Sequence, residues 1–555
     1  MSLSCVLVTL VLGVVALDAQ TEPATNNSTA SWIVQGDDIG TATQLVESVG
    51  GQVVQHLAVI HAVVADLTPQ QVTRLEGRSD SSRLFKNELV RTAARGGGGG
   101  GGSDETDFPA LIDADLLHTL GIFGRGVRIA FIDTYIPGFS WIPSLYNDSD
   151  GNPRGSTVHY SSSDPDAHVD HGHSTHVMGV AASSLKTKKG KFNGIAPDAS
   201  LVLLNAFRSD GSALYSDVIA AIEWVIEQSQ YVSIAPNGVS SRLRVLNLSF
   251  SAPPRSYYWD DPLNQAVMAA WQAGIVVVAS AGNTGPDPMT IGAPGNVPYI
   301  ITVGAMTDNF TAGEGGDDSL ASFSGTGPTF EGFVKPEIVA PGGHLRAVMH
   351  KDSVLANEYQ EFFDRKNYFT MSGTSQAAGV ISGVVALMLE ANPSLTPDDV
   401  KCRLMGGARP AINPDGTLAY SLFQQGAGMV NAYDAVFASD SGCANRGLEI
   451  DLDLAGTQHY RGQANQWSDG SYYIDGMDGD GYTWTGGFLW SDGFLWSDGF
   501  LWSDGFLWSD GFLWSDGFLW SDGFMWSDAF VEFDGFMWSD AMTEPASINV
   551  WVEQE

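Results

Sequence analysis

Apolar residues occur in short, nearly unbroken runs between residues 104 and about 440, and helix-like segments separate these runs. Four of the runs are Val127–Ile132, Leu201–Leu204, Val245–Leu248 and Ile275–Ala279. Runs of this kind are typical of strands that are buried on both faces of a parallel sheet. The pattern therefore predicts a large α/β domain whose sheet is mostly parallel.

Residues 31–95 have a different pattern, in which short strands and helices follow in the order β-α-β-β-α. The predicted strands are 31–35, 52–57 and 59–67, and the predicted helices are 41–49 and a second one from Thr68 onward. The Thr68 side chain suits an N-cap, and Pro69 suits the first turn of a helix. This order predicts a small α+β domain in front of the large one.

The N-terminus carries an apolar run, Val6–Leu17, that is too short to span a bilayer. Such a run is typical of the core of a secretory signal peptide. We therefore expect residues 1–19 to be removed on export and the protein to be secreted to the extracellular side. A buried N-terminal strand is the alternative. We expect no transmembrane segment in the mature form.

Seven consecutive glycines, Gly96–Gly102, separate the small domain from the large one. A run of this composition does not hold one conformation, and a protease can reach it easily. We assign residues 96–103 as a glycine linker between the two domains.

Acidic residues outnumber basic ones by 64 to 27, which gives a formal net charge of −37 and a pI near 4.3. A surface of this charge repels phosphate backbones and anionic membranes, which argues against binding to nucleic acid or to a membrane surface. The excess is uneven, because residues 445–555 contain 20 acidic and 2 basic residues, a net charge of −18 (2 − 20). This last region is expected to attract cations.

Only three cysteines are present, which excludes a disulfide framework and zinc sites built from paired CxxC motifs. Cys5 lies in the predicted signal peptide. Cys402 and Cys443 form a candidate disulfide that would tie the end of the large domain to the segment after it. Two buried free thiols are the alternative.

Three residues of the large domain supply the groups that nucleophilic catalysis needs. Asp133 ends a predicted parallel strand, at the sheet edge where ligands bind in α/β folds. His173 lies in the motif Gly172–Gly179, and Ser375 lies in the motif Ser372–Ala378 directly before an apolar helix. A serine hydroxyl is a weak nucleophile, so a histidine must accept its proton and a carboxylate must orient that histidine. Asp133, His173 and Ser375 supply these three types of group, although each residue alone has an ordinary structural explanation.

The chain order Asp, His, Ser resembles that of the subtilisin-like serine peptidases, the subtilases. Further segments similar to the family are Asn193–Pro197, Val245–Ser249, Ala279–Asn283, Gly292–Gly295, Ile301–Ala305, Lys335–Gly342 and Gln425–Ala432. The resemblance covers about residues 104–440 and implies a subtilisin-like three-layer α/β domain with a parallel sheet. The preceding small domain resembles the family's inhibitory propeptide, which is ferredoxin-like. A permanent adaptor domain is the alternative.

The resemblance and the composition together divide the chain into seven parts. These are a signal peptide (1–19), an inhibitory propeptide (20–95), a glycine linker (96–103), a peptidase domain (104–440), an acidic connecting segment (441–486), a hexapeptide repeat (487–540) and a C-terminal end (541–555). The propeptide is expected to inhibit its own peptidase until the enzyme cuts between about Leu89 and Ser103.

The resemblance also implies a role for each site residue. Ser375 attacks the scissile carbonyl, His173 takes and returns the proton, and Asp133 orients His173. Asn283 donates its side-chain amide to the oxyanion, together with the backbone N–H of Ser375. The implied primary substrate pocket is formed by Ser249, Phe250, Ser251, Ala279, Ser280 and Gly292. None of these carries a fixed charge, which predicts a preference for large apolar side chains before the cut.

Three positions depart from the family pattern. Tyr135 and Ser174 stand where the family usually has glycine, and Gly379 stands where it usually has proline. The Tyr135 ring would either crowd the substrate beyond the cut or pack on the rim, and the Ser174 hydroxyl is placed to cap a turn. None of the three changes removes a reacting group, so we expect a divergent but active enzyme.

The histidine-rich segment allows a second interpretation as a metal site. Its candidate ligands are His168, Asp170, His171, His173 and His176. No second set of ligands is evident, and the triad explains the same residues with fewer assumptions. We therefore expect no cofactor to be required for the chemistry.

The C-terminal tail repeats Gly-Phe-Leu-Trp-Ser-Asp six times from Gly487 to Asp522. Phe-Leu-Trp suits a short β-strand, and Ser-Asp-Gly suits a turn. Stacked repeats would place their aspartates about 4.8 Å apart, where the carboxylates repel each other. Such a stack would need bridging cations, or carboxylates that are hydrated and well separated. Asp475, Asp478 and Asp480 form a candidate calcium site that would contribute stability. Binding of carbohydrate, docking on the catalytic domain, and a solvated tail without a ligand are the other functions left open.

These patterns predict a secreted, self-processing serine endopeptidase that hydrolyses protein substrates with broad specificity. One rival is a surface-attachment protein whose tail is the functional part, and deletion of residues 487–540 would separate the two. The other rival is a processing enzyme with a narrow substrate, which a panel of unrelated proteins would identify.

Overall fold

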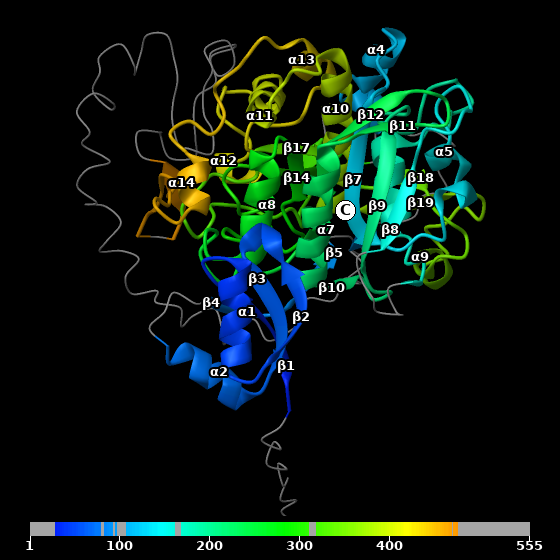
Figure 1. The fold of residues 1–555 in the computed structure, drawn as a ribbon. Coiled ribbons are helices and arrows are strands. Elements are labelled where there is room, and N and C mark those ends of the chain that lie inside the picture. The colour runs from blue at the N-terminus through cyan, green and yellow to red at the C-terminus, as the bar shows by residue number, and fades with distance from the viewer. Residues whose placement is uncertain are drawn as a thin grey trace, which may run out of the picture. The chain divides into compact units, whose positions relative to one another are not determined.

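The structure is a computed structural model, and it describes residues 28–78, 83–92, 95–96, 107–160, 168–309, 318–468 and 470–474 (Figure 1). The chain divides into two compact units, of which the first is Met1–His56 with His61–Lys86 and the second is Leu57–Ile60 with Asn87–Glu555. Several predictions fall outside the described residues. These concern the signal peptide 1–19, most of the glycine linker, the hexapeptide repeat, residues 541–555 and the candidate calcium ligands Asp475, Asp478 and Asp480.

The first unit contains the predicted β-α-β-β-α order. Its elements are β1 (Ala30–Gln35), α1 (Ile39–Ser48), β2 (Gln52–Leu57), β3 (Ala62–Leu67), α2 (Pro69–Glu76) and β4 (Arg83–Lys86). The sheet has the strand order β2-β3-β1-β4, and β1 runs antiparallel to both β3 and β4. Thr68 caps α2 as predicted, because its hydroxyl accepts a hydrogen bond from the Gln71 N–H at 3.3 Å.

One strand boundary in this unit differs from the prediction. Residues 59–67 were expected to form one strand, but Ala58–Ile60 form a 3-10 turn and β3 begins only at Ala62. His61 lies between them with a φ of 54°, a left-handed conformation that breaks a strand. Apolar residues alone cannot reveal such a turn.

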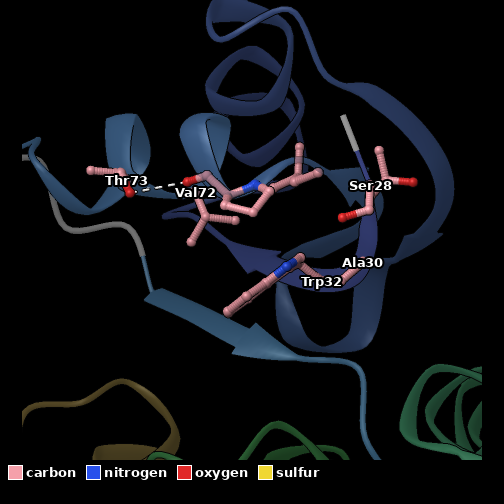
Figure 2. A pocket seen from close by; sticks show the side chains of 8 residues that line it. Ser28, Ala30, Trp32, Val72 and Thr73 are labelled. Atoms are coloured by element: carbon pink, nitrogen blue, oxygen red, sulfur yellow. Dashed lines mark hydrogen bonds between the residues drawn. The ribbon is translucent and has the colours of Figure 1, made fainter. Parts of the chain in front are cut away.

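The first unit also has a shallow apolar pocket beside β1 and the start of α2 (Figure 2). Its volume is about 310 Å³, and its lining includes Trp32, Leu67, Pro69 and Val72. None of the predicted catalytic or substrate-binding residues lines this pocket.

The second unit is built on a nine-stranded sheet whose central strands are parallel. The main path runs β16-β15-β14-β12-β7-β9-β8, with β11 beside β12 and β17 beside β15. The bounds are β7 (Val127–Thr134), β8 (Thr157–Tyr160), β9 (Ser200–Phe207), β11 (Val232–Ile234), β12 (Ser240–Leu248), β14 (Val276–Ser280), β15 (Ile301–Thr307), β16 (Ser319–Leu320) and β17 (Ile338–Pro341). The four apolar runs in the sequence fall in β7, β9, β12 and β14, with Ile275 one residue before the start of β14.

Helices pack on this sheet in two pairs. One pair is α6 (His173–Ala182) with α10 (Thr374–Ala391), and the other is α7 (Tyr215–Ser229) with α8 (Pro262–Gln272). Smaller helices are α3 (Phe108–Leu111), α4 (Ala114–Thr119), α5 (Pro143–Tyr146), α9 (Val354–Glu358), α11 (Pro397–Gly406), α12 (Leu422–Gln425) and α13 (Ala432–Phe437). Parallel strands flanked by helices confirm the predicted three-layer α/β fold.

The apolar helix expected after Ser375 is α10. Among the described residues it is the one helix whose length and composition would suit a membrane span. Every residue from Thr374 to Leu389 is buried inside the fold, so α10 is the core helix of the second unit. Its glycines allow close packing on α6, since a Cβ at Gly383 would lie 2.7 Å from the Ala181 carbonyl oxygen.

A disulfide joins Cys402 in α11 to Cys443. The two Cα atoms are 5.4 Å apart, and 41 residues separate the cysteines in the sequence. This Cα separation lies within the ordinary range for a disulfide.

Removing this crosslink, as Cys402→Ala/Cys443→Ala, is expected to lower the free energy of unfolding by up to about 4 kcal/mol, because the open chain regains the entropy of the loop. Urea unfolding measures the difference, in a Ser375→Ala background that prevents self-digestion. Reducing the parent chain with dithiothreitol should give the same loss. If the parent, the double variant and the reduced parent had the same free energy of unfolding, this result would contradict the Cys402–Cys443 bond.

Residues 448–474, which the sequence predicted only as a connecting segment, form packed structure. They contain α14 (Ile450–Leu454) and a hairpin of β20 (Ala464–Gln466) and β21 (Tyr472–Ile474). Asp453 is buried in this segment and accepts hydrogen bonds from the Tyr258 and Tyr299 hydroxyls and from His459. The backbone N–H of Gly462 donates to the carbonyl oxygen of Glu331 at 2.9 Å.

Glu331 is expected to make stability depend on pH, because burial raises the pKa of its carboxyl from 4.5 to about 7. Between pH 4.5 and 7 the folded state therefore binds a proton that the unfolded state has released. The contribution of the Glu331 carboxyl to folding stability is therefore fully present below pH 4.5, and it is lost as pH rises through 7. Glu331→Gln should remove this dependence of stability on pH. Between pH 5 and pH 8 the free energy of unfolding of the variant should therefore rise by about 3 kcal/mol relative to that of the parent.

Thermal or urea unfolding of both chains at pH 5 and pH 8 tests this, again in the Ser375→Ala background. The exposed Glu361→Gln variant is the matched control and should show no such change. A stability difference between Glu331→Gln and the parent that is the same at both pH values would contradict the prediction.

Candidate active site

The Asp133 and His173 side chains meet at the carboxyl end of the parallel sheet. Asp133 is the penultimate residue of β7, and His173 is the first residue of α6. The His173 Nδ1 atom lies 2.8 Å from Asp133 Oδ1 and 2.9 Å from Oδ2, and both side chains are buried. Within the described part of the chain, His173 Nε2 has no hydrogen-bond partner. The carboxylate thus holds one ring nitrogen and leaves the other available to accept a proton.

The turn before His173 requires glycine. Gly172 has a φ of 100°, which side chains rarely adopt. A Cβ at this position would also lie 2.6 Å from Met349 Sδ and 2.8 Å from Ser353 Oγ. This close approach fixes the loop that carries the histidine.

Ser375 is the second residue of α10, directly after β19 (Tyr368–Ser372) and Gly373. Its hydroxyl donates a hydrogen bond to the Ser249 carbonyl oxygen at 3.0 Å, and the Ser249 hydroxyl donates to the Ser375 carbonyl oxygen at 2.9 Å. The N–H groups of the first helical turn have no partner within the helix. The Ser375 N–H therefore lies where developing negative charge is stabilised.

Hydrogen bonds from Thr374 fix the side-chain amide of Asn283. Its Oδ1 atom accepts hydrogen bonds from the Thr374 N–H at 3.0 Å and from the Thr374 hydroxyl at 2.8 Å. These two bonds fix the amide plane next to Ser375. The Asn283 Nδ2 group is buried and has no partner among the described residues. A buried, unpaired amide N–H group costs free energy unless another group accepts its hydrogen bond, which points to a function at this position.

The predicted substrate-pocket residues come together from three segments. Ser249, Phe250 and Ser251 follow β12, Ala279 and Ser280 end β14, and Gly292 lies in the next loop. The Ser280 hydroxyl donates to the Phe250 carbonyl oxygen at 3.0 Å. A Cβ at Gly292 would lie 2.8 Å from Ser251 Cβ, so glycine is required for the two walls to approach.

A segment of the chain before the peptidase core lies against these same residues. Strand β5 (Leu89–Thr92) is antiparallel to β10 (Ser212–Leu214) on one side and to β13 (Phe250–Ser251) on the other. Strand β6 (Arg95–Gly96) then pairs with β19, with Arg95 opposite Ser372. Both strands belong to the second unit. The chain therefore runs from the predicted substrate-binding strand to the strand that leads into Ser375.

The three departures from the family pattern are accommodated locally. The Tyr135 ring packs edge-on against His168, with ring centroids 5.7 Å apart. The Ser174 hydroxyl accepts a hydrogen bond from the Thr134 hydroxyl at 3.3 Å. A Cβ at Gly379 would lie 3.0 Å from the Val177 carbonyl oxygen, so this glycine lets α10 approach α6.

The other histidines near His173 do not gather around a metal position. His176 Nε2 lies 3.0 Å from the Phe369 carbonyl oxygen and 3.1 Å from that of Leu345, which is the environment of a core histidine. Burial lowers the pKa of both His171 and His176 to about 4, so both are neutral at pH 7. Asp170 pairs with His350 at 2.9 Å. Among the described residues, no group of three His, Cys, Asp or Glu side chains could hold a metal ion.

Sequence reasoning did not find two residues that position the site. Thr374 fixes the Asn283 amide, and Thr134 joins the Asp133 strand to Ser174 through hydrogen bonds of 3.3 and 3.2 Å. Both residues are direct neighbours of predicted catalytic residues. Their position next to a catalytic residue is the one indication that the sequence contains. A threonine at such a position does not by itself predict a positioning role.

Comparisons with known proteins agree with this geometry. The model of the subtilase family matches residues 124–428, more than half of the chain. Serine protease AprX of Bacillus subtilis (strain 168) is 37% identical over 313 residues, which cover 56% of this chain and 66% of that protein. Subtilisin DY of Bacillus licheniformis is 31% identical over 310 residues, which cover 54% of this chain and 89% of that protein.

A solved structure shows the same fold. The crystal structure of fervidolysin from Fervidobacterium pennivorans, described as a keratinolytic enzyme related to subtilisin, matches with a TM-score of 0.56. The sequence identity is 21%, and the match covers 74% of this chain and 61% of that chain. The fold and the site thus define a subtilisin-like serine peptidase. The chain belongs to the subtilase family.

Proposed function

We propose that this protein is a secreted, self-processing serine endopeptidase that uses Asp133, His173 and Ser375 as a triad. The observation that carries this proposal is the buried Asp133–His173 pair, in which the carboxylate binds Nδ1 and leaves Nε2 without a partner. In this mechanism His173 Nε2 removes the Ser375 proton while Oγ attacks the scissile carbonyl carbon. The same nitrogen then delivers the proton to the leaving amine, and water hydrolyses the acyl-enzyme.

The tetrahedral intermediate needs hydrogen-bond donors for its oxyanion. We propose the Asn283 Nδ2 group and the Ser375 N–H for this role. The Asn283 amide is already fixed by Thr374, so it does not need to reorganise during the reaction.

Self-processing is supported by the positions of β5 and β6. Thr92 pairs with Phe250 on the substrate-binding strand, and Arg95 pairs with Ser372, three residues before the nucleophile. Only residues 93 and 94 separate Thr92 from Arg95. We propose that the enzyme cuts its own chain at the Ala93–Ala94 bond, and that residues 20–93 then act as the inhibitory propeptide. Protein substrates would pair with β10 and β13 in the same way as β5.

The proposed specificity follows from the absence of charge at the substrate pocket. Ser249, Phe250, Ser251, Ala279, Ser280 and Gly292 are all uncharged. We therefore propose that the enzyme prefers foreign substrates with a large apolar side chain before the cut. We also propose that it hydrolyses a broad range of proteins.

Calcium in the acidic tail is a separate proposal, and the chemistry itself is proposed to need no cofactor. If Asp475, Asp478 and Asp480 hold calcium, EDTA should lower the thermal unfolding temperature of the full chain, and added calcium should restore it. A triple Asp→Asn variant at these positions should not respond to EDTA. An unfolding temperature of the parent chain that EDTA leaves unchanged would remove the calcium site.

The function is tested by expressing residues 20–555 as the parent chain and as Ser375→Ala. The parent should release an N-terminal fragment, show a new N-terminus at Ala94 and hydrolyse casein. The variant should keep its full length and leave casein intact. If the two chains behave alike and neither cuts, the peptidase proposal fails and the function lies elsewhere, with the tryptophan-rich tail as the next candidate.

A further inference from the structure

The segment after the subtilase match contacts the two stretches of chain that continue from the predicted substrate pocket, named here its two walls. We propose that residues 448–474, named here the C-terminal clamp, position these walls and thereby set how strongly the enzyme selects the side chain before the cut. This inference rests on the proposed peptidase function. The family match ends at residue 428, so the clamp lies outside the segment that identifies the family.

The first wall is the chain that continues from β13 toward α8. Tyr258 lies on this chain, and its hydroxyl donates to Asp453 at 2.5 Å. The neighbouring Trp259 ring stacks on His459, with centroids 4.8 Å apart and an interplanar angle of 9°. Arg461 places its guanidinium 5.2 Å from the centre of the Tyr257 ring. Three consecutive aromatic residues of this wall are thus held by the clamp.

The second wall is the chain from Gly282 to Tyr299, which includes Gly292. The Tyr472 hydroxyl donates to Met289 Sδ at 2.8 Å, and the Tyr299 hydroxyl donates to Asp453 at 3.0 Å. Met289 has a φ of 61°, so its backbone conformation needs support from its surroundings. The clamp therefore contacts this wall on both sides of Gly292.

Asp453 is the residue that joins the two walls. Its carboxylate is buried and accepts from Tyr258 on the first wall, from Tyr299 on the second, and from His459 within the clamp. A buried carboxylate is tolerated only when hydrogen bonds compensate its lost hydration. Replacing Asp453 removes the acceptor that the three donors share, and with it the one described side chain that hydrogen-bonds to both walls.

The hairpin of the clamp adds backbone contacts to the same region. The Ala464 N–H donates to the Gly332 carbonyl oxygen at 3.0 Å, and the Gly462 N–H donates to that of Glu331. The Glu331 carboxylate in turn accepts from the Tyr258 N–H at 2.7 Å. The clamp thus reaches the first wall by a second route that does not pass through Asp453.

The two walls also touch directly, which explains why their spacing is sensitive. Ala252 and Ala293 exchange two backbone hydrogen bonds of 2.9 and 2.8 Å, and a Cβ at Gly292 would clash with Ser251 Cβ at 2.8 Å. In a pocket this tight, a small shift of either wall changes which side chain fits. One side-chain contact in such a pocket discriminates by roughly 10- to 200-fold.

The test compares Asp453→Asn with Asp451→Asn, an exposed residue of the same helix. One readout is the ratio of kcat/KM for matched peptides with Phe or Ala before the cut. The other is hydrogen exchange at the Ala252, Thr290 and Ala293 amides. Asp453→Asn should lower the ratio about tenfold and speed exchange at these amides, whereas Asp451→Asn should change neither. The fraction of chains labelled at Ser375 by a fluorophosphonate should stay the same in both variants.

An unchanged ratio and unchanged exchange in Asp453→Asn would overturn the clamp. The proposal would also be overturned if kcat/KM fell equally for both peptides while the fraction of chains labelled at Ser375 decreased, because that pattern indicates a general folding defect. Tyr472→Phe removes only the hydroxyl that donates to Met289, so it should give the same changes with smaller size, and it guards against a variant that fails to fold. If the parent chain neither labels nor cuts, the peptidase function fails, and the exchange data alone then decide whether the clamp holds the walls.

Discussion

Replacing His173 by alanine is expected to lower kcat on the order of a million-fold, close to the loss from replacing Ser375. Without the imidazole no group accepts the serine proton, and the hydroxyl remains a weak nucleophile at neutral pH. The remaining activity should come from substrate binding and the oxyanion donors alone. Initial rates on a chromogenic peptide, measured at saturating substrate, give the loss directly.

Asp133→Asn is the graded comparison within the triad, and His168→Ala is the matched control outside it. Asp133→Asn should lower kcat about ten-thousand-fold, because the asparagine no longer holds His173 in the tautomer whose Nε2 can accept a proton. His168 is exposed and its ring packs against Tyr135, and its replacement should leave kcat within a factor of two or so. Retention of more than about a hundredth of the parent activity by His173→Ala would contradict the assigned base.

Replacing Asn283 by alanine is expected to lower kcat by roughly a hundred- to a thousand-fold and to leave KM nearly unchanged. The amide contacts the oxygen only when it becomes negatively charged, so its loss raises the barrier without weakening substrate binding. Full kinetic curves on one peptide substrate separate the two constants. A raised KM with an unchanged kcat would show that Asn283 binds the substrate and does not stabilise the transition state.

Thr374→Val provides the graded comparison for Asn283. It removes the hydroxyl that donates to Asn283 Oδ1 and keeps the Thr374 N–H, which donates to the same oxygen. The amide then has one positioning bond instead of two. We expect a loss of kcat that is clearly smaller than for Asn283→Ala, and the double variant should be no worse than Asn283→Ala alone.

The sequence predicted the parts of the fold that depend on local patterns. Apolar runs such as Val245–Leu248 became buried parallel strands, because a strand covered on both faces cannot alternate polar and apolar residues. Thr68 capped its helix because the capping bond is made within three residues. Asp133 and His173 could be paired in advance only through the family resemblance, since 40 residues separate them.

The sequence could not predict contacts that arise from distant parts of the chain. The segment at residues 448–474 looked like an acidic connection, because its apolar residues are few and its carboxylates many. Asp453 is nevertheless buried, and its partners Tyr258 and Tyr299 lie 195 and 154 residues away. The pairing of β5 with β10 and β13 was likewise invisible, because a strand of four residues has no periodicity that names its partners.

The measurement that tests the central claim most directly is covalent labelling with a fluorophosphonate, followed by mass spectrometry of the digested protein. Such a reagent reacts with a serine whose hydroxyl is activated by a neighbouring base: the serine oxygen bonds to phosphorus and fluoride leaves. The triad predicts one modified residue, Ser375, in the parent chain and no modification at this serine in His173→Ala. Labelling at another residue, or equal labelling of Ser375 in both chains, would contradict the triad.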